Sequence, residues 1–302
     1  MIPRQVIPAA SLRLSSGPVQ TIRQLLLASR NADGGWGYYA GKGSRLEPTC
    51  WALLALSGDG DARQQCARAL GEWPVSNGVL LERPGGQPNY AFHALALLTL
   101  RAFRLSHRAG DAALLQGLVD AKGIQLEQSP DFRQDNSLQA WSWVPETFSW
   151  VEPTAWSLLA LKKSDRSPTS EQRIAEGERL LVDRACSPGG WNFGNSRVYE
   201  SDLPPYVPTT AIALLALQDR PVTPSLDAGL KFLAQEAPVE SSSMALGLGA
   251  LALSAWGRTQ AGLSNALERQ LSTTAEIGSL LGIGIGLYAL KQIKDPDATF
   301  RL

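Results

Sequence analysis

The sequence predicts an all-α protein built as an α6/α6 toroid, with six inner helices surrounded by six outer ones. Two observations lead to this prediction. Amphipathic and wholly apolar helical segments alternate along the 302 residues, and one loop-plus-helix motif recurs within them. A helix that is apolar on every side must be covered on every side, whereas an amphipathic helix can lie on a surface. Alternation therefore puts the apolar helices in an inner ring and the amphipathic helices in an outer ring.

The elements follow one another in six pairs of about 50 residues each. Amphipathic helices are predicted at residues 16–30, 60–73, 108–121, 169–185, 224–236 and 261–272. Apolar helices are predicted at residues 47–56, 89–103, 152–161, 208–217, 241–256 and 277–290. Six pairs are enough for a ring to close, and an open solenoid of helix pairs is the alternative. We expect a single toroid domain over 1–302, with an N-terminal extension at 1–15 and a C-terminal tail at 292–302.

The recurring motif is a Trp-containing loop that leads into an apolar helix. It occurs three times, at Trp36–Leu56, Trp141–Leu161 and Trp191–Leu217. In the first two copies the Glu of a Glu-Pro-Thr helix start follows the Trp by 11 residues. The third loop is five residues longer, and Val207 is aligned there with Glu47 and Glu152. Because all inner helices of a toroid begin at one end, the three loops are predicted to converge on one mouth.

Composition excludes several classes of function. Lys plus Arg and Asp plus Glu both count 28, so no net charge attracts nucleic acid. The three cysteines show no CxxC spacing, which favours a reducing compartment. No apolar run reaches the roughly 20 residues of a transmembrane helix, and the N-terminal stretch lacks a signal-peptide core. We therefore expect a cytoplasmic protein, with peripheral association with a membrane as an option.

The motif residues resemble a known superfamily. Its carriers are Gly34-Gly35-Trp36, Glu47-Pro48-Thr49, Glu152-Pro153-Thr154, Gly189-Gly190-Trp191 and Pro208-Thr209-Thr210. Together they are similar to the repeat of the squalene/terpenoid cyclase and protein prenyltransferase β-subunit superfamily. The resemblance implies the α/α toroid and an isoprenoid-handling activity.

The residues known to act in that superfamily are only partly present. The Asp-x-Asp-Asp of the cyclases and the Cys-Gly-Glu-Gln of thioester domains are absent, and His93 and His107 are the only histidines. No metal or cofactor is therefore expected. Glu47 and Glu152 match the middle Asp of the cyclase motif, and Asp202 is a third candidate catalytic carboxylate. A helix N-terminus lowers the pKa of a carboxyl group, so Glu47 and Glu152 are predicted to suit cation stabilisation, or else to serve only the helix starts.

Aromatic residues gather in the three loops and are candidates for binding an apolar chain or a carbocation. Tyr38, Trp143, Trp150, Phe193 and Tyr206 occur outside the repeat and are the preferred substrate-binding candidates. Trp36, Trp141 and Trp191 either bind substrate or pack one repeat against the next, and His93 is either a core histidine or a substrate contact. The loop cations Lys42, Arg45, Arg133 and Arg197 are candidates for binding a diphosphate or an acidic partner.

Two functions are carried forward. The first is an isoprenoid-handling enzyme resembling a terpenoid cyclase β-domain, with an apolar pocket in the lumen and mouth of the toroid. The second is a non-catalytic toroid that binds a lipid, a peptide or a protein, related to a prenyltransferase β-subunit without its zinc. The expected partners are an isoprenoid or other lipid-like ligand, and a protein partner or second copy that covers the mouth.

Overall fold

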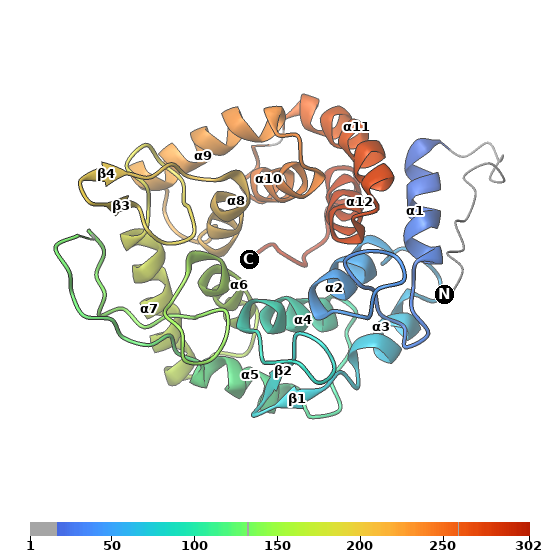
Figure 1. Cartoon of the computed structure of the whole chain (residues 1–302), viewed down its shortest axis with the longest axis horizontal. Helices are drawn as coiled ribbons and strands as arrows, with labels where there is room; N and C mark the ends of the chain where they lie inside the picture. Colours follow the sequence, from blue (N-terminus) through green and yellow to red (C-terminus); the bar gives the residue numbers. More distant parts are fainter. Residues whose placement is uncertain (1–16, 132, 259) are drawn as a thin grey trace, which may run out of the picture.

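The computed structural model describes residues 17–131, 133–258 and 260–302, so the predicted extension at 1–15 lies outside the described residues. Within the described part, the chain forms twelve α-helices, one short 3-10 helix and two small antiparallel hairpins. The helices alternate between two concentric rings (Figure 1). This arrangement confirms the predicted all-α toroid.

The inner ring is made of the six apolar helices. They are α2 (Leu46–Ala55), α4 (Tyr90–Ala102), α6 (Val151–Lys162), α8 (Val207–Ala216), α10 (Ser243–Ala255) and α12 (Leu280–Lys294). Each packs against the next in chain order, and α12 packs against α2. The ring is therefore closed, as Figure 1 shows, and the open solenoid is wrong.

The outer ring is made of the six amphipathic helices, which bury one side each. They are α1 (Pro18–Ala28), α3 (Ala62–Leu70), α5 (Asp111–Asp120), α7 (Pro168–Asp183), α9 (Pro224–Glu236) and α11 (Ala261–Ile277). The predicted ends agree to within a few residues except at α11, which continues five residues past 272. It ends at Ile277 and is capped by Gly278, whose φ of 79° places it in the left-handed conformation that commonly closes a helix.

Three short elements were not predicted. The hairpin of β1 (Val75–Ser76) and β2 (Val79–Leu80) precedes α4, the hairpin of β3 (Arg197–Val198) and β4 (Ser201–Asp202) precedes α8, and the 3-10 helix η1 (Ala237–Val239) follows α9. The β1–β2 turn, Asn77-Gly78, has positive φ at both residues, as a type I′ turn requires. Asn-Gly is a strong local hairpin signal in a sequence, so this element was predictable.

The N-terminal ends of the inner helices lie at one end of the toroid, and we call this end the mouth. The evidence is a set of hydrogen bonds in which the first residue of an inner helix donates its N–H to the loop before a neighbouring inner helix. The pairs are Leu46 to Glu82, Tyr90 to Trp143, Val151 to Phe193 and Leu280 to Tyr38, at 2.8–3.1 Å. The three Trp-containing loops therefore meet at the mouth, as predicted.

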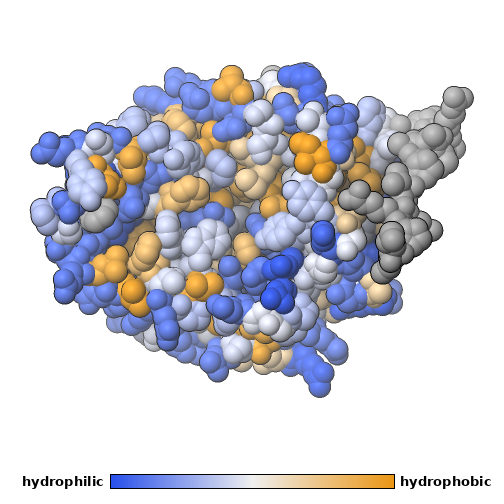
Figure 2. Space-filling view, in the orientation of Figure 1, coloured by the Kyte–Doolittle hydropathy of each residue, from blue (hydrophilic) through white to orange (hydrophobic). Residues whose placement is uncertain are grey.

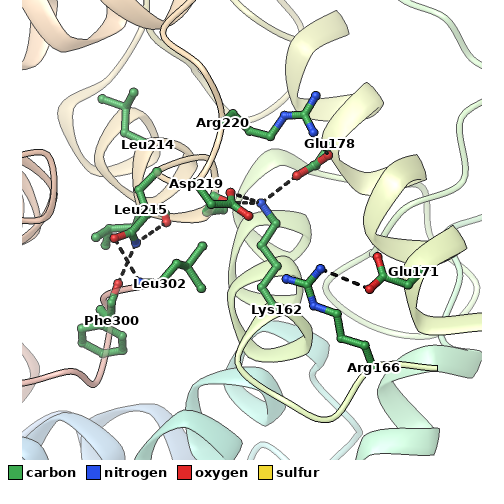
Figure 3. Close-up of polar contacts among 12 residues, drawn as sticks. Lys162, Arg166, Glu171, Glu178, Leu214, Leu215, Asp219, Arg220, Phe300 and Leu302 are labelled. Atoms are coloured by element: carbon green, nitrogen blue, oxygen red, sulfur yellow. Dashed lines mark hydrogen bonds and ion pairs between the residues drawn. The ribbon is translucent and has the colours of Figure 1, made fainter. Parts of the chain in front are cut away.

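A buried ion cluster joins α6, α7 and the end of α8 near the opposite end of the toroid (Figure 3). The Lys162 side chain is 1% exposed, and its Nζ lies 2.7 Å from Glu178 and 2.5 Å from Asp219. It also donates to the Ala216 carbonyl at 2.8 Å. Three acceptors thus satisfy the ammonium group, which is the condition for burying a charge.

No helix in the described ranges is both long and apolar enough to span a membrane. On the face drawn in Figure 2, hydrophilic residues dominate the periphery, while hydrophobic and intermediate residues mix with them toward the centre.

Candidate functional site

Each recurring Trp is fixed by a threonine of the following inner helix. The Thr49 hydroxyl accepts from the Trp36 N–H at 2.9 Å and also lies within hydrogen-bond distance of the Trp36 carbonyl. Thr154 does the same for Trp141, and Thr210 for Trp191. Because these backbone groups are buried, the hydroxyl stabilises them where a valine would leave them unpaired. The Pro-Thr signature therefore sets the position of each mouth loop.

The three Trp side chains serve this packing. Trp36, Trp141 and Trp191 are at most 1% exposed. Their indole N–H groups donate to carbonyl oxygens of Leu26, Leu118 and Leu181 in the preceding outer helices, at 2.6–2.8 Å. The packing interpretation of these residues is thus the one that the structure supports, since they offer no surface to a ligand.

These contacts also correct the alignment of the third copy. Thr210, and not Thr209, occupies the place of Thr49 and Thr154 in the hydrogen bonds to the Trp N–H. Pro208, one residue after Val207, therefore stands where the other copies have Glu47 and Glu152. The alignment of Val207 with these glutamates was wrong by one residue, because adjacent threonines made the register ambiguous.

Glu47 and Glu152 occupy the second position of α2 and α6, and both are only partly exposed. The Tyr38 hydroxyl donates to Oε2 of Glu47 at 2.7 Å. Trp51 and Trp156 follow four residues after the two glutamates, and their rings meet edge to face with centroids 5.9 Å apart. Side chains four apart on a helix share a face, so each carboxyl group lies about one helical turn from the Trp of its own helix. The charge of Glu47 acts on Glu152, which places the two carboxyl groups in the same region of the mouth.

Burial changes the protonation of both glutamates. Desolvation raises the pKa of Glu47 to about 7, while the hydrogen bond from Tyr38 acts in the opposite direction. Desolvation and then the charge of Glu47 raise the pKa of Glu152 to about 8. The expectation of lowered pKa values was wrong, because burial disfavours the charged form of both carboxyl groups. Burial therefore favours the protonated form of both carboxyl groups, and the charge of Glu47 adds to this effect at Glu152.

An aromatic cluster closes the lumen below the two carboxyl groups. Phe300 of the C-terminal tail lies with its ring 5.5 Å, centroid to centroid, from each of Trp51, Trp156 and Tyr288. All four side chains are at most 4% exposed. We call these four residues the aromatic floor. The tail enters the centre of the ring, where Figure 1 places the C-terminus.

The aromatic floor occupies the centre of the ring, so the predicted pocket does not extend through the lumen at this level. Sequence reasoning missed these residues, since inner helices that are apolar all round have no face that marks the lumen. A usable signal was present in the repeat, where Glu47 and Glu152 are each followed by a Trp at the i+4 position. Side chains four apart on a helix share a face, so carboxylate and indole point to one side.

The preferred loop aromatics lie around the mouth in separate pairs. Trp143 packs edge to face on Phe92, with centroids 5.9 Å apart, and Trp150 lies 4.7 Å from Phe148. Phe193 and Tyr206 are 52% and 44% exposed and pack against each other at 5.3 Å. Trp143 and Trp150 are partly buried, so these four of the five preferred candidates have some accessible surface.

Two further candidates are not brought to the carboxylate pair. Asp202 lies on the exposed β3–β4 hairpin at the periphery of the ring, where its nearest cation is Arg197 at 3.8 Å (Figure 1). His93 is fully buried. Its Nδ1 accepts from the Leu80 N–H at 3.1 Å and its Nε2 lies 3.0 Å from the Leu114 carbonyl. Burial lowers the pKa of His93 to about 4, so it is a neutral core histidine at the helix position that Thr49 holds in α2.

An open cleft of about 880 Å³ adjoins the mouth between the Trp36 loop, the loop before α4 and the start of α12. Tyr38 lines it together with Lys42, Arg45 and Arg83. Arg45 forms an ion pair with Glu82, whereas Arg133 and Arg197 do not line this cleft. Tyr38 therefore connects the cleft to Glu47, and Lys42 is the loop cation from the sequence analysis that lies in it without an ion pair among the described residues.

Among the residues that the structure describes, no three His, Cys, Asp or Glu side chains gather closely enough to hold a metal ion. The Asp-Pro-Asp sequence at Asp295–Asp297 takes part in contacts that hold the C-terminal tail. Asp297 accepts from the Tyr288 hydroxyl at 3.0 Å and lies 3.7 Å from Lys291.

The fold and this mouth define an α/α toroid with a carboxylate pair over an aromatic floor. No protein-family model matches the chain, and no curated protein matches it in sequence. Solved structures do match. A protein from Actinoplanes is 16% identical with a TM-score of 0.57, over 92% of this chain and 98% of that one. A wild-type glycosidase is 12% identical with a TM-score of 0.57, over 92% and 96%.

The apo structure of the type II terpene cyclase MstE from Scytonema is 13% identical with a TM-score of 0.55, over 92% of this chain and 98% of that one. At these identities the likeness shows the fold alone. Glycosidases and a terpene cyclase are both among the similar structures, so the chemistry must be argued from the site.

Proposed function

We propose that the protein is an acid–base enzyme of the terpene-cyclase type that acts on an isoprenoid or similarly apolar substrate at the mouth of the toroid. The observation that carries the proposal is the Glu47–Glu152 pair, one turn above the aromatic floor. A carboxyl group that stays protonated near neutral pH is suited to general acid catalysis, because its pKa is close to the working pH.

Different environments give the two carboxyl groups different roles. Glu152 has the higher pKa and is the proton donor. Glu47 is the acceptor, since the hydrogen bond from Tyr38 stabilises its anion. In the proposed step the Glu152 O–H bond breaks and a C–H bond forms at an alkene carbon, which leaves a carbocation. The π electrons of a second alkene in the substrate then form a C–C bond to this carbon, which closes a ring and moves the positive charge. A C–H bond next to the new cation breaks, its electron pair forms the product alkene, and its proton passes to Glu47.

Aromatic rings next to the pair support a cationic intermediate. The edge of the floor formed by Trp51 and Trp156 lies beneath the carboxyl groups, and Trp143 and Trp150 stand in the mouth loops. Indole faces attract cations, by about 2 kcal/mol or more where water is excluded. The likeness to a terpene cyclase fold agrees with this chemistry, although the Asp-x-Asp-Asp motif is absent from this chain.

A second candidate, glycoside hydrolysis, is favoured by the same pair, because glycosidases generally use one protonated and one ionised carboxyl group. The fold likeness to a glycosidase is compatible with it. A non-catalytic toroid that binds an apolar ligand at the mouth is the third reading, and it predicts binding without turnover.

Incubation with isoprenoids of increasing chain length in D₂O tests the proposal. A proton-initiated reaction incorporates one deuterium on carbon, and we expect Glu152→Gln to lower the rate by at least about 100-fold. Glu276→Gln is the matched control, since Glu276 is exposed on α11. Turnover of aryl glycosides without deuterated isoprenoid would establish the second candidate, and binding of isoprenoids without any turnover would establish the third.

A further inference from the structure

A second cleft, of about 450 Å³, lies at the end of the toroid opposite the mouth. The C-terminal ends of α4, α6 and α12 surround it, and the tail residues 297–299 form one wall. Its charged lining residues are Arg101, Arg104, Lys163, Lys291 and Asp297. Four cations thus face one carboxylate.

Three of the four cations have no carboxylate partner. Lys291 donates to Ser57 Oγ at 2.5 Å and lies 3.7 Å from Asp297. Lys163 donates only to backbone carbonyls of the tail, at 2.7 Å in the case of Ala298. Within the described part of the chain, neither Arg101 nor Arg104 has a carboxylate within ion-pair distance. The residues that line this cleft therefore carry an excess of positive charge. Arg101 and Arg104 also line a neighbouring cleft that contains Asp111 and Asp165, neither of which forms an ion pair with them.

Helix ends account for only part of this charge. Cations commonly lie at helix C-termini, where they interact with the last carbonyls. Arg101 and Lys291 in the last turns of α4 and α12, and Lys163 at the C-cap of α6, fit that role. Arg104 lies beyond the helix with a φ of 53°, so a left-handed turn brings it to the same cleft. The pKa of Lys163 is lowered first by burial and next by the charge of Arg101, a sign of repulsion inside the cluster.

We propose that this cleft binds a small phosphorylated molecule, with the phosphate or diphosphate group held by Arg101, Arg104 and Lys163. Planar guanidinium groups bind phosphate oxygens in pairs, and the ammonium group adds a point charge. Binding would also restrain the C-terminal tail against α4 and α6, because Lys163 donates hydrogen bonds to carbonyl oxygens of the tail. The site is independent of the carboxylate pair at the mouth and of the reaction proposed there.

Calorimetric titration with inorganic pyrophosphate at constant ionic strength tests the site. We expect saturable binding that Arg101→Gln/Arg104→Gln weakens by at least about 10-fold. Arg179→Gln/Arg269→Gln is the matched control, because it removes the same charge from exposed positions on α7 and α11. Both arginines of the cleft are exposed, so the variants are expected to fold, which circular dichroism checks.

A second measurement locates the bound ligand. Pyrophosphate should slow amide hydrogen exchange at residues 298–300 in the wild type and not in the cleft variant. No saturable binding at millimolar pyrophosphate, or an equal loss in both double variants, would overturn the proposal. Binding to vesicles that contain anionic phospholipid, lost in the cleft variant while free pyrophosphate does not bind, would instead assign the site to a lipid headgroup and overturn the small-molecule assignment.

Discussion

The Tyr38 hydroxyl donates a 2.7 Å hydrogen bond to Glu47, so the residue that lines the large cleft also sets the charge of the proposed base. This hydrogen bond lowers the pKa of the Glu47 carboxyl group, whereas burial raises it. Its strength is therefore open to a direct measurement.

We expect Tyr38→Phe to raise the pKa of Glu47 by about one unit, because a hydrogen bond to a charged group contributes about 1.5–3 kcal/mol before water replaces it. Carbon-13 NMR of labelled glutamate can follow the titration. Tyr39→Phe is the control, since Tyr39 is about half exposed and no hydrogen bond joins it to Glu47. A pKa that does not move in Tyr38→Phe would mean that burial alone sets it.

Glu152 links stability to pH. Its pKa is about 8 in the folded protein against 4.5 for an ordinary glutamate, so the folded state binds the proton more tightly. The stability that this proton contributes is complete below pH about 4.5 and is lost as the pH rises to about 8. Glu152→Gln should therefore match the wild type within about 1 kcal/mol at pH 5 and exceed it by roughly 1–3 kcal/mol at pH 9. Urea unfolding at both values measures this, and parallel curves would contradict the raised pKa.

The Trp–Thr contacts predict a cost for removing a single oxygen atom. Thr154→Val keeps the shape of the side chain but leaves the buried Trp141 N–H without its acceptor. We expect a loss of about 1–3 kcal/mol in the free energy of unfolding. Thr154→Ser retains the hydroxyl and should recover most of it. Equal losses in the two variants would show that the methyl group, and not the hydroxyl, stabilises the loop.

Lys162→Met should lower the free energy of unfolding by about 2–4 kcal/mol, because Glu178 and Asp219 lose their shared cation (Figure 3). Asp219 is partly exposed, which keeps the cost below the largest known values. Arg166→Gln is the control from the same view. It breaks an exposed pair with Glu171 at 3.1 Å and should cost less than about 0.5 kcal/mol. A Lys162→Met protein as stable as the wild type would mean that the cluster is dispensable.

His93 should not titrate between pH 5 and 8. Its pKa is lowered to about 4 and its two ring nitrogens contact Leu80 and Leu114, so nitrogen-15 NMR should show one neutral tautomer over that range. Because the Leu80 N–H donates to Nδ1, the proton is expected on Nε2. A chemical-shift change centred near pH 6.5 would show that the histidine reaches water.

The ring was predictable because helix character is a local property. The 208–217 segment has no polar face and the 224–236 segment has one, and both properties are visible in the sequence. Because an apolar helix must be covered on every side, the first belongs to the inner ring and the second to the outer ring. Glu47 and Glu152 were found through the repeat. Their raised pKa values were not, since burial depends on what surrounds the mouth after folding.

The aromatic floor, too, could be predicted only in part from the sequence. Trp51 and Trp156 are signalled by their spacing from the glutamates, whereas Phe300 depends on the path of the tail beneath the ring. That path is held by contacts such as Gln218 with the Phe300 carbonyl at 2.7 Å, between residues far apart in the chain. Local patterns carry no information about such contacts.

Closure of the ring has a kinetic consequence. Lys291 of α12 bonds to Ser57 beside α2 across 234 positions of the chain. Helix pairs that follow one another are close in the sequence. This seam joins the two ends of the chain, so it must overcome the entropy of closing almost the whole polypeptide. The chain is therefore expected to assemble as a curved row of helix pairs and to join its two edges last.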